Sequence, residues 1–351
     1  MSNGNVTITD VAKLAEVSVS TVSNLLNGRD ERMRPSTRQR IVEAIEHLGY
    51  TPNQAARQLK TGQSSILGLI VPSVANPFYG FFAREVEKVA LARGYQILLG
   101  NSDRDPERER NYAEELWGYG VRGIIFGSSL VAFTHLHDLI KRGMHVVAFE
   151  GPSQDEEQVA INSIGVDNVQ AARLATKHLL ALGHRRIGFL SGPIRTVSRL
   201  DRLAGYRSAL VEAGIAYDAQ LVWQGTESTS YGDADAVELG QQGTHDLLSL
   251  VDPPTAIFAI NDMYAFGAYA GARDLSQRIP QDLSVVGFDD IMLSRVVEPP
   301  LTTIRQPMGD IARLAVERLL GQLEETSTAA PGHIALAPRL IVRGSTSPYP
   351  N

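Results

Sequence analysis

Apolar and polar positions near the start of the chain follow the period of short amphipathic helices. The first group of apolar positions is Ile8, Val11, Ala12 and Ala15. Ser18 is a favourable N-cap for a second helix that runs to about Leu26. A third helix is expected over residues 35–48, because Pro35 suits a first helical turn and apolar residues recur behind it. The pattern predicts a small all-α unit.

The pattern changes after residue 63, where short apolar runs begin to alternate with longer amphipathic stretches. The short runs predict strands over residues 66–71, 95–99, 121–126, 146–149, 186–190, 256–260 and 283–288. The longer stretches predict helices over 78–93, 106–119, 137–142, 168–182, 199–213, 234–250 and 263–275. Strands that alternate with helices build βαβ units, so the predicted fold class is α/β with parallel sheets.

The second predicted helix has an outward face of small polar side chains. Val22, Leu25 and Leu26 would be buried, and the opposite face carries Val19, Ser20, Thr21, Ser23 and Asn24. Hydroxyls and an amide on a short helix suit the major groove of DNA, where such groups reach base edges. Helix-turn-helix spacing alone also occurs in ordinary surface helices, so the specific residues decide the interpretation.

The residues of this stretch match the pattern D-V-A-x-x-A-x-V-S-x-x-T-V-S-x-x-L-N, from Asp10 to Asn27. In this motif the chain resembles the lactose-repressor (LacI/GalR-type) family of bacterial transcription regulators. Further sequence motifs that resemble those of the family are A-L-G-H-R-R-I at 181–187, N-D at 261–262 and S-V-V-G-F-D-D at 284–290. The resemblance therefore covers essentially the whole chain, although Arg34 stands where the family usually has Ser or Thr.

The resemblance implies a set of DNA-contacting residues. They are Thr7, Ser18, Val19, Ser20, Thr21, Ser23, Asn24, Asn27, Tyr50, Asn53, Ala56, Arg57 and Leu59. Residues 53–60 resemble the family's hinge helix, and eight residues are too few for a stable isolated helix, so ordering on DNA is expected. Leu59 matches the apolar wedge that enters the minor groove, although an apolar linker residue is the alternative.

The resemblance also implies a two-lobed core like that of periplasmic binding proteins, with an effector in the cleft at the carboxyl ends of the strands. The implied effector-binding residues are Pro72, Ser73, Asn76, Phe78, Glu150, Arg202, Asn261 and Asp289. Arg202, Asn261 and Asp289 are the main candidates, because a guanidinium, an amide and a carboxylate together offer hydrogen-bond donors and acceptors for the vicinal hydroxyls of a sugar. Alternatively, Arg202 and Asp289 form a buried interlobe ion pair. Trp223 and Tyr231 are weaker candidates for stacking on a sugar ring.

The expected domain organisation follows from these assignments. Residues 1–50 form the helix-turn-helix head, 51–63 the hinge helix and linker, and 64–351 the effector-binding and dimerisation core. Within the core, the first lobe is expected at about 64–162 plus 292–323, and the second at about 163–291 plus 324–351. The family members that tetramerise use a leucine-rich terminal helix, and none follows residue 343, so a homodimer is expected.

Charge and composition narrow the classes of function. The net charge of −6 divides into 8 Lys/Arg against 6 Asp/Glu in residues 1–62, and 25 against 33 in the remainder. A mildly basic head on an acidic body orients the head toward DNA. No cysteine is present, and no apolar run approaches the length of a membrane span, so a cytoplasmic protein without a membrane partner is expected.

Enzyme and transport alternatives are weaker. Glu150 and Asp289 could be interpreted as the paired carboxylates of a glycosidase, but such a site leaves the DNA-reading head unexplained. His135-x-His137 lacks further ligands at metal spacing, and no Walker, nucleophile-elbow or dinucleotide fingerprint occurs. We expect no enzymatic activity, cofactor or metal. A solute-binding protein fits the cleft but not the first 60 residues.

The sequence therefore predicts a homodimeric transcriptional regulator that binds a pseudo-palindromic operator. We expect a repressor of carbohydrate-use genes controlled by a small-molecule effector, a sugar or sugar derivative. A purine- or nucleoside-responsive regulator of the same type is the alternative. Whether the effector acts as inducer or corepressor is not encoded in any motif that we identify.

Overall fold

The computed structural model describes residues 6–26, 30–51, 64–128, 133–150, 161–225, 235–326 and 331–349. The chain forms two compact units, Met1–Gln63 and Ser64–Asn351. We call them the head and the core. Their division falls at the end of the expected linker. Within the described ranges, no helix has the length and apolar character needed to cross a membrane.

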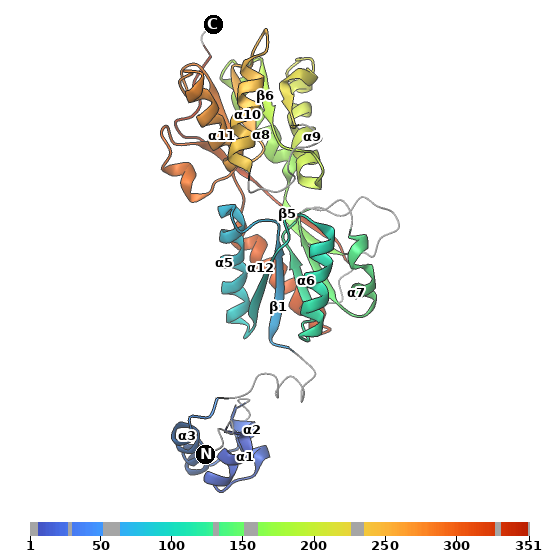
Figure 1. Ribbon diagram of the computed structural model, residues 1–351, viewed down its shortest axis with the longest axis vertical. Helices are drawn as coiled ribbons and strands as arrows, with labels where there is room; N and C mark the ends of the chain where they lie inside the picture. The colour runs from blue at the N-terminus through green and yellow to red at the C-terminus, as the bar shows by residue number, and fades with distance from the viewer. Residues whose placement is uncertain are drawn as a thin grey trace. The chain divides into compact units, whose positions relative to one another are not determined.

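The described residues of the head form three helices, as the apolar spacing predicts. They are α1 (Ile8–Leu14), α2 (Val19–Leu26) and α3 (Pro35–Leu48), labelled in Figure 1. Their buried residues form one small cluster, Val11, Ala12, Ala15, Val22, Ile41 and Ala44. The Ser18 hydroxyl accepts from the backbone N–H of Thr21 at 3.2 Å, which is the predicted cap of α2. Arg34 makes no side-chain cap at the start of α3, as expected for a residue without a hydroxyl.

The first lobe of the core is a parallel sheet with helices on its faces. Its strands are β1 (Ile66–Val71), β2 (Gln96–Asn101), β3 (Gly123–Phe126), β4 (His145–Phe149), β5 (Asn162–Val166) and β11 (His333–Leu336). Its helices are α5 (Pro77–Ala92), α6 (Pro106–Gly118), the 3₁₀ turn η1 (Thr134–Leu136), α7 (His137–Lys141) and α12 (Met308–Leu323). The strand order is β11-β5-β4-β3-β1-β2, and each neighbouring pair is parallel.

The second lobe repeats this architecture. Its strands are β6 (Ile187–Leu190), β7 (Val222–Trp223), β8 (Ala256–Ala259), β9 (Ser284–Asp289), β10 (Thr302–Arg305) and β12 (Arg339–Ile341). Its helices are α8 (Asn168–Ala181), α9 (Val197–Glu212), η2 (Ala219–Leu221), α10 (Ala236–Leu248), α11 (Asp262–Asp274) and η3 (Met292–Arg295). The strand order is β12-β10-β9-β8-β6-β7, and within it only β12 runs antiparallel to its neighbour. The α/β class with two parallel-dominated sheets is confirmed.

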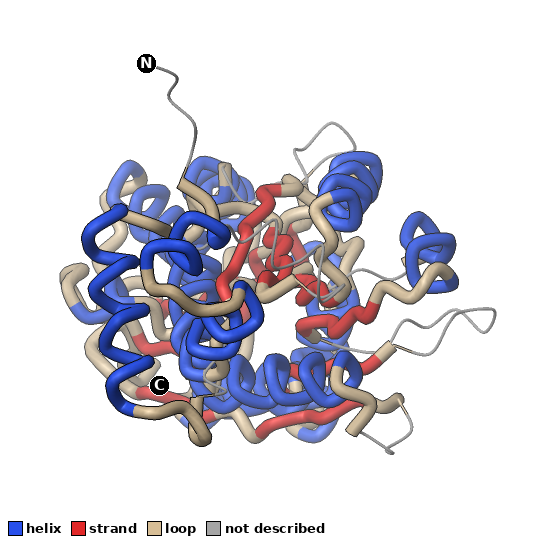
Figure 2. Tube along the Cα trace, turned by 90° about the horizontal axis from the view of Figure 1, so that it is seen from below, coloured by secondary structure: helices blue, strands red, loops and turns tan. Residues whose placement is uncertain are grey.

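Apolar clusters lie between each sheet and its helices. In the first lobe, α5 and α12 cover one face, where Phe82 and Ile311 are fully buried. The other face is covered by α6 and the short α7, where Phe126 and Leu139 are buried. In the second lobe α8 packs against α9, and α10 packs against α11. Figure 2 shows the strands of the core flanked by these helices.

The chain crosses between the lobes more than once, and the crossings divide it differently from the expected boundaries. Thr302–Arg305 was expected in the first lobe but pairs with β9 in the second sheet. His333–Leu336 was expected in the second lobe but pairs with β5 in the first sheet. The physical reason is that a short strand belongs to the sheet whose edge offers it hydrogen bonds, which its own few residues do not specify.

Candidate functional site

The outward face of α2 is the candidate DNA-binding face. Val19 is 39% exposed, Ser20 and Asn24 are exposed, and Val22 on the opposite side is fully buried. The hydroxyl of Ser18 lies 2.7 Å from the hydroxyls of both Ser20 and Thr21. These hydroxyls organise the start of the helix, while the amide of Asn24 is presented to solvent. The structure thus places together the side chains expected to read bases.

The other predicted DNA contacts have different positions. The hydroxyl and the backbone N–H of Thr7 both donate to the carboxylate of Asp10, at 2.7 and 2.8 Å, so Thr7 begins α1. Tyr50 is half-buried against the head's apolar cluster. Asn27 and the predicted hinge residues Asn53, Ala56, Arg57 and Leu59 lie outside the described residues, and their roles stay predictions.

A polar cleft between the two lobes is the candidate effector site. Its lining residues are Asn76, Phe78, Tyr79, Arg104, Phe149, Glu150, Ser198, Arg199, Arg202, Ile260, Asn261 and Asp289. They lie at the carboxyl ends of parallel strands or in the segments that follow them, where α/β folds bind ligands. The lining comes from both lobes, so a ligand bound there would contact both.

Arg202 is the centre of the cleft's hydrogen-bond network. Its Nε donates to Oδ1 of Asn168 at 2.8 Å, its Nη1 to the carbonyl of Ile260 at 2.6 Å, and its Nη2 lies 3.4 Å from Oε1 of Glu150. Its guanidinium also lies 3.5 Å from the ring centroid of Phe288. The interlobe ion pair of Arg202 is therefore with Glu150, not with Asp289 as the sequence-based alternative had it.

The position of Arg202 depends on a close approach of two helices. A Cβ atom at Gly205 would lie 2.2 Å from the carbonyl oxygen of Val169, so only glycine allows α9 to pack this closely on α8. This packing brings Arg202 on α9 to Asn168 at the start of α8. The glycine at position 205 thus has a structural cause.

Asp289 is buried at the end of β9. Its Oδ1 accepts from Nε2 of Gln306 at 2.8 Å. Burial raises the pKa of Asp289 well above its usual range; Arg202 lowers this pKa, and the carboxylates of Asp262 and Glu150 raise it further. A protonated Asp289 can both donate and accept hydrogen bonds.

Three charged residues of the cleft have a left-handed backbone conformation. Arg104, Glu150 and Asp289 have φ angles of +57°, +67° and +122°, in a region that side-chain-bearing residues rarely adopt. Such conformations persist only where the surroundings impose them, and they concentrate at functional sites. All three residues line the cleft. The described part of the chain has eight non-glycine residues with positive φ, and three of them line this one cleft.

The cleft is almost filled by its own side chains. Its free volume is about 30 Å³, which matches one water molecule and is far below the several hundred Å³ of a typical ligand site. Binding of a sugar-sized molecule therefore requires the lobes to separate or the lining side chains to move. A two-lobed fold with crossing segments permits such hinge motion.

Only some of the predicted effector-binding residues line the cleft. Asn76, Phe78, Glu150, Arg202, Asn261 and Asp289 are brought together in the cleft, but Pro72 and Ser73 are not among its lining residues. Ser73 is buried, and the carbonyl of Pro72 accepts from the backbone of Asp103. Trp223 is not among the lining residues, and its indole donates to Asp246 at 2.7 Å. Tyr231 lies outside the described residues.

Sequence reasoning missed other lining residues. Arg199 precedes Arg202 by one helical turn on α9, so the helical period was a usable signal for it. Phe149 and Ile260 end predicted strands, and Tyr79 adjoins Phe78. Arg104 has no such signal, because its placement in the cleft depends on two consecutive left-handed residues, Asp103 and Arg104.

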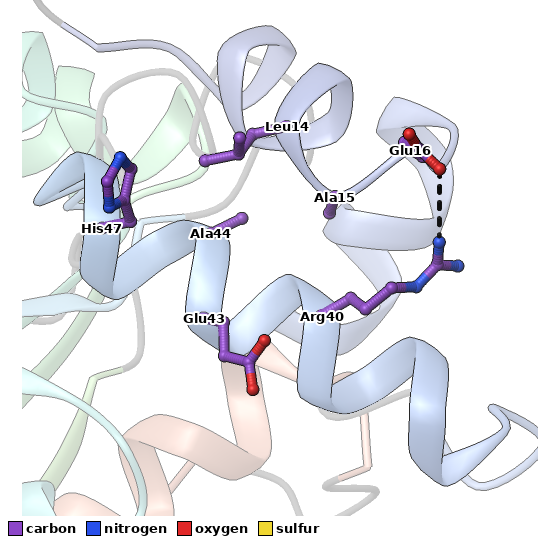
Figure 3. Close-up of a pocket in the computed structure, with 7 residues that line it drawn as sticks. All are labelled: Leu14, Ala15, Glu16, Arg40, Glu43, Ala44 and His47. Carbon is purple, nitrogen blue, oxygen red and sulfur yellow. Dashed lines mark ion pairs between the residues drawn. The ribbon is translucent and has the colours of Figure 1, made fainter.

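A groove of about 410 Å³ lies on the head, between α1 and α3, and Figure 3 shows its lining. The lining residues are Leu14, Ala15, Glu16, Arg40, Glu43, Ala44 and His47. Leu14 is 48% exposed, and the Arg40–Glu16 ion pair at 3.8 Å is largely exposed. None of these residues belongs to α2. Despite its greater volume, we favour the interlobe cleft as the ligand site, because its polar groups are buried and converge.

The histidines considered as metal ligands have another arrangement. Nε2 of His135 lies 3.0 Å from Oε2 of the fully buried Glu109. Oε1 of Glu109 accepts from the hydroxyls of Ser102 and Ser128, at 3.2 and 3.0 Å. Across the described part of the chain, no group of three or more candidate ligands has metal-binding geometry. The Glu109–His135 pair joins α6 to the 3₁₀ turn η1 within the first lobe.

A helix-turn-helix head joined to a two-lobed ligand-binding core defines a class of ligand-controlled DNA-binding proteins. Family comparison agrees for each part. Residues 7–53 match "Bacterial regulatory proteins, lacI family", and residues 176–346 match "Periplasmic binding protein-like domain". The chain belongs to the lacI family of bacterial transcriptional regulators, whose members are regulators and not enzymes.

Two characterised relatives align along nearly the whole chain. Catabolite control protein A of Priestia megaterium is 37% identical, over 97% of this chain and 99% of its own length. The HTH-type transcriptional regulator DegA of Bacillus subtilis (strain 168) is 34% identical, over 97% and 98%. This coverage extends the family assignment over head and core together.

Solved structures agree with the fold. The lac repressor dimer bound to operator and the anti-inducer ONPF has a TM-score of 0.84 at 28% identity, covering 98% of this chain and all of that one. The transcriptional regulator CelR in complex with cellobiose has a TM-score of 0.71 at 29% identity, covering 97% and 99%.

Proposed function

We propose that this regulator is a homodimeric repressor whose binding to a pseudo-palindromic operator is controlled by a small-molecule effector in the interlobe cleft. The observation that carries the proposal is the presence in one chain of an exposed recognition face on α2 and a strained, buried polar cleft in the core. The first gives sequence-specific contact with DNA, and the second gives differential binding of a ligand to two core states.

The dimer follows from how such heads read DNA. One head covers only a half-site, and two heads related by two-fold symmetry read two half-sites about one helical turn apart. The lac repressor structure to which this chain is similar is a dimer on its operator. We extend that arrangement to this chain, and we place the protein in the cytoplasm, where bacterial DNA lies.

For the effector we propose a sugar or a sugar derivative. Arg202, Asn261 and Asp289 would hold hydroxyl groups, since all three have buried polar atoms in the cleft. The similar CelR structure holds cellobiose. A nucleoside is the second candidate, because the rings of Phe78 and Phe149, whose centroids lie 5.8 Å apart, offer apolar faces for a base.

The proposal is tested in two steps with the full-length protein. Selection from random DNA should enrich a pseudo-palindrome, and a thermal-shift panel of neutral sugars, sugar acids, sugar phosphates and nucleosides should find a compound that raises the melting temperature. That compound should then change the affinity for the selected DNA. Failure to enrich any sequence, or a stabilising compound without effect on DNA binding, would contradict the proposed function.

A further inference from the structure

Arg202 and Glu150 bind each other across the interlobe cleft. Nη2 of Arg202 lies 3.4 Å from Oε1 of Glu150, and both side chains are more than nine-tenths buried. Among the described residues, the carboxylate of Glu150 has one other hydrogen-bond partner, the side-chain amide of Asn168 at 3.4 Å. Arg202 and Asn168 belong to α9 and α8 of the second lobe, whereas Glu150 follows β4 of the first. Glu150 is therefore a first-lobe side chain whose carboxylate is bound by the second lobe.

The first sheet holds the backbone of Glu150 in a conformation that is rare for a residue with a side chain. Its φ is +67°, and its N–H donates to the carbonyl of Ile164 on β5 at 2.9 Å. A Cβ atom at Gly165 would lie 2.9 Å from Cα of Glu150, so only glycine lets β5 run this close to it. Such conformations are costly and persist where the surrounding structure imposes them. A role for Glu150 in the contact between the lobes accounts for this cost.

The guanidinium of Arg202 is held more closely by its own lobe than by Glu150. Its hydrogen bonds to Asn168 and to the carbonyl of Ile260 are 2.8 and 2.6 Å long. Charge-assisted hydrogen bonds are normally about 2.7–2.9 Å long, so the contact of 3.4 Å with Glu150 is a long one. When the lobes separate, Arg202 keeps its second-lobe partners and loses Glu150.

The same contact limits access to the cleft. The free volume of about 30 Å³ is far too small for a sugar or a nucleoside. A ligand that accepts a hydrogen bond from Nη2 of Arg202 needs the donor that now faces Glu150. The ligand and the carboxylate of Glu150 therefore compete for one group, and an acceptor at normal hydrogen-bond distance has the advantage.

This inference rests on the proposed function: we propose that Glu150 is a built-in competitor of the effector. Its carboxylate binds Arg202 across the cleft and holds the lobes together, and the effector displaces it by presenting an acceptor oxygen to Arg202. The core that can take up an effector is then a minor, open fraction, and the apparent affinity is reduced by that fraction. Glu150 thus sets the affinity of the site without touching the effector, in contrast to the direct contact that the family resemblance implies.

The distance between the lobes tests the proposal without any added ligand. The chain has no cysteine, so Asn111→Cys on α6 and Val211→Cys on α9, both exposed positions, give two defined sites for spin labels. Labelled full-length chain is mixed with an excess of unlabelled chain, so that label pairs lie within one protomer. Double electron–electron resonance then measures the distance between the lobes. Glu150→Gln keeps the size of the side chain and removes its charge, and we expect it to shift the main distance to a longer value.

A second variant and a control complete this measurement. Gly165→Ala should also lengthen the distance, because its methyl group displaces the backbone of Glu150 and leaves every charge in place. Asp282→Asn is the matched control, because its carboxylate is bound at 2.7 Å by Arg278 of the same lobe, and it should keep the parent distance. Tryptophan fluorescence verifies that each core is folded. An unchanged distance in both Glu150→Gln and Gly165→Ala would overturn the proposal, as would an equal lengthening in the control.

Calorimetry of the full-length protein measures the competition itself. The compounds are glucose, cellobiose, ribose and adenosine. A compound that binds the parent should bind Glu150→Gln about tenfold more tightly, because the open fraction rises from about a tenth toward one. Weaker binding to Glu150→Gln would show that Glu150 contacts the effector directly, and the proposal would be wrong. If none of the four compounds binds the parent, the distance measurement decides alone.

Failure of this inference and failure of the proposed function give different results. Lobes that keep their distance in both variants would leave the selection of an operator by the unaltered protein intact. A protein that enriches no DNA sequence would instead refute the proposed regulator, whatever the distance between its lobes.

Discussion

The exposed face of α2 and the interlobe cleft hold their functional side chains in opposite physical settings. On α2, Ser20 and Asn24 project to solvent, and the residues that hold the helix in place lie on its other side. In the cleft, Arg202 and Glu150 are only 7% and 4% exposed and bind each other. In the head, the residues proposed to recognise DNA are therefore different from those that stabilise the fold, whereas in the cleft the residues proposed to bind the effector also stabilise the fold. Four substitutions test this contrast.

The largest effect is expected for Arg202→Ala. This change leaves the buried carboxylate of Glu150 without its cation, so the free energy of unfolding of the core should fall by about 3–5 kcal/mol. Urea unfolding followed by tryptophan fluorescence measures it, because Trp117 and Trp223 both lie in the core. The control Arg207→Ala, on the exposed side of the same helix, should lose less than about 1 kcal/mol. If the free energy of unfolding falls by a similar amount in both variants, Arg202 does not have a special role in the stability of the core.

Ile41→Ala should have the next largest effect. Ile41 is fully buried in a cluster of small side chains, so its truncation should destabilise the head by about 2–5 kcal/mol. DNA binding and helical circular dichroism should fall, while the tryptophan unfolding midpoint of the core stays the same. Gln39→Ala, exposed on the same helix, is the control. A shift of the core midpoint would show that the two units do not unfold separately.

Asn24→Ala isolates recognition from stability. Its amide is exposed and can make paired hydrogen bonds to a base, so specific affinity should fall by about 1–3 kcal/mol. The free energy of unfolding should change by no more than about 0.5 kcal/mol. Gel shifts on the selected operator and on random DNA measure the difference. An equal loss on both DNAs would assign Asn24 to the DNA backbone or to the fold.

The smallest effect is expected for Asp289→Asn, and it depends on pH. The raised pKa means that the folded state binds the Asp289 proton more tightly than the unfolded state does. This contribution is fully present below the ordinary value of 3.8 and is lost as the pH rises through the folded pKa. Asparagine imitates the protonated form, so the variant should gain stability relative to the parent as the pH rises.

Urea unfolding of parent and variant between pH 5 and pH 8 measures the Asp289 effect. Asp262, whose pKa burial raises to about 7, contributes a slope of the same sign and also raises the pKa of Asp289. The difference between parent and variant therefore reports the two interacting carboxyl groups together. A difference that does not vary with pH would show that Asp289 is ionised in the folded protein as it is in the unfolded one.

The same contrast explains what could be predicted from sequence. The third helix of the head was expected over 35–48 and is α3 (Pro35–Leu48), because its apolar period, its first-turn proline and Gly49 after it are local signals. Asn261 and Asp289 were expected as cleft residues because they match effector-binding positions of the family that the chain resembles. Arg104 was not, because nothing local distinguishes a buried arginine from a solvated one. Strand β11 was assigned to the wrong lobe because its residues only alternate between exposed and half-buried. Such a pattern predicts a strand but does not indicate the sheet with which it pairs.

The packing of α12 beneath the first sheet has a consequence for synthesis on the ribosome. The head is complete within its first 51 residues, but the first lobe cannot cover Phe82 and Val86 until Met308–Leu323 has emerged. Roughly 140 residues separate β5 from α12, which corresponds to roughly 7–30 s of translation. During that interval the nascent chain exposes an apolar sheet face. Chains truncated before α12 should therefore aggregate or be degraded, instead of accumulating as folded single lobes.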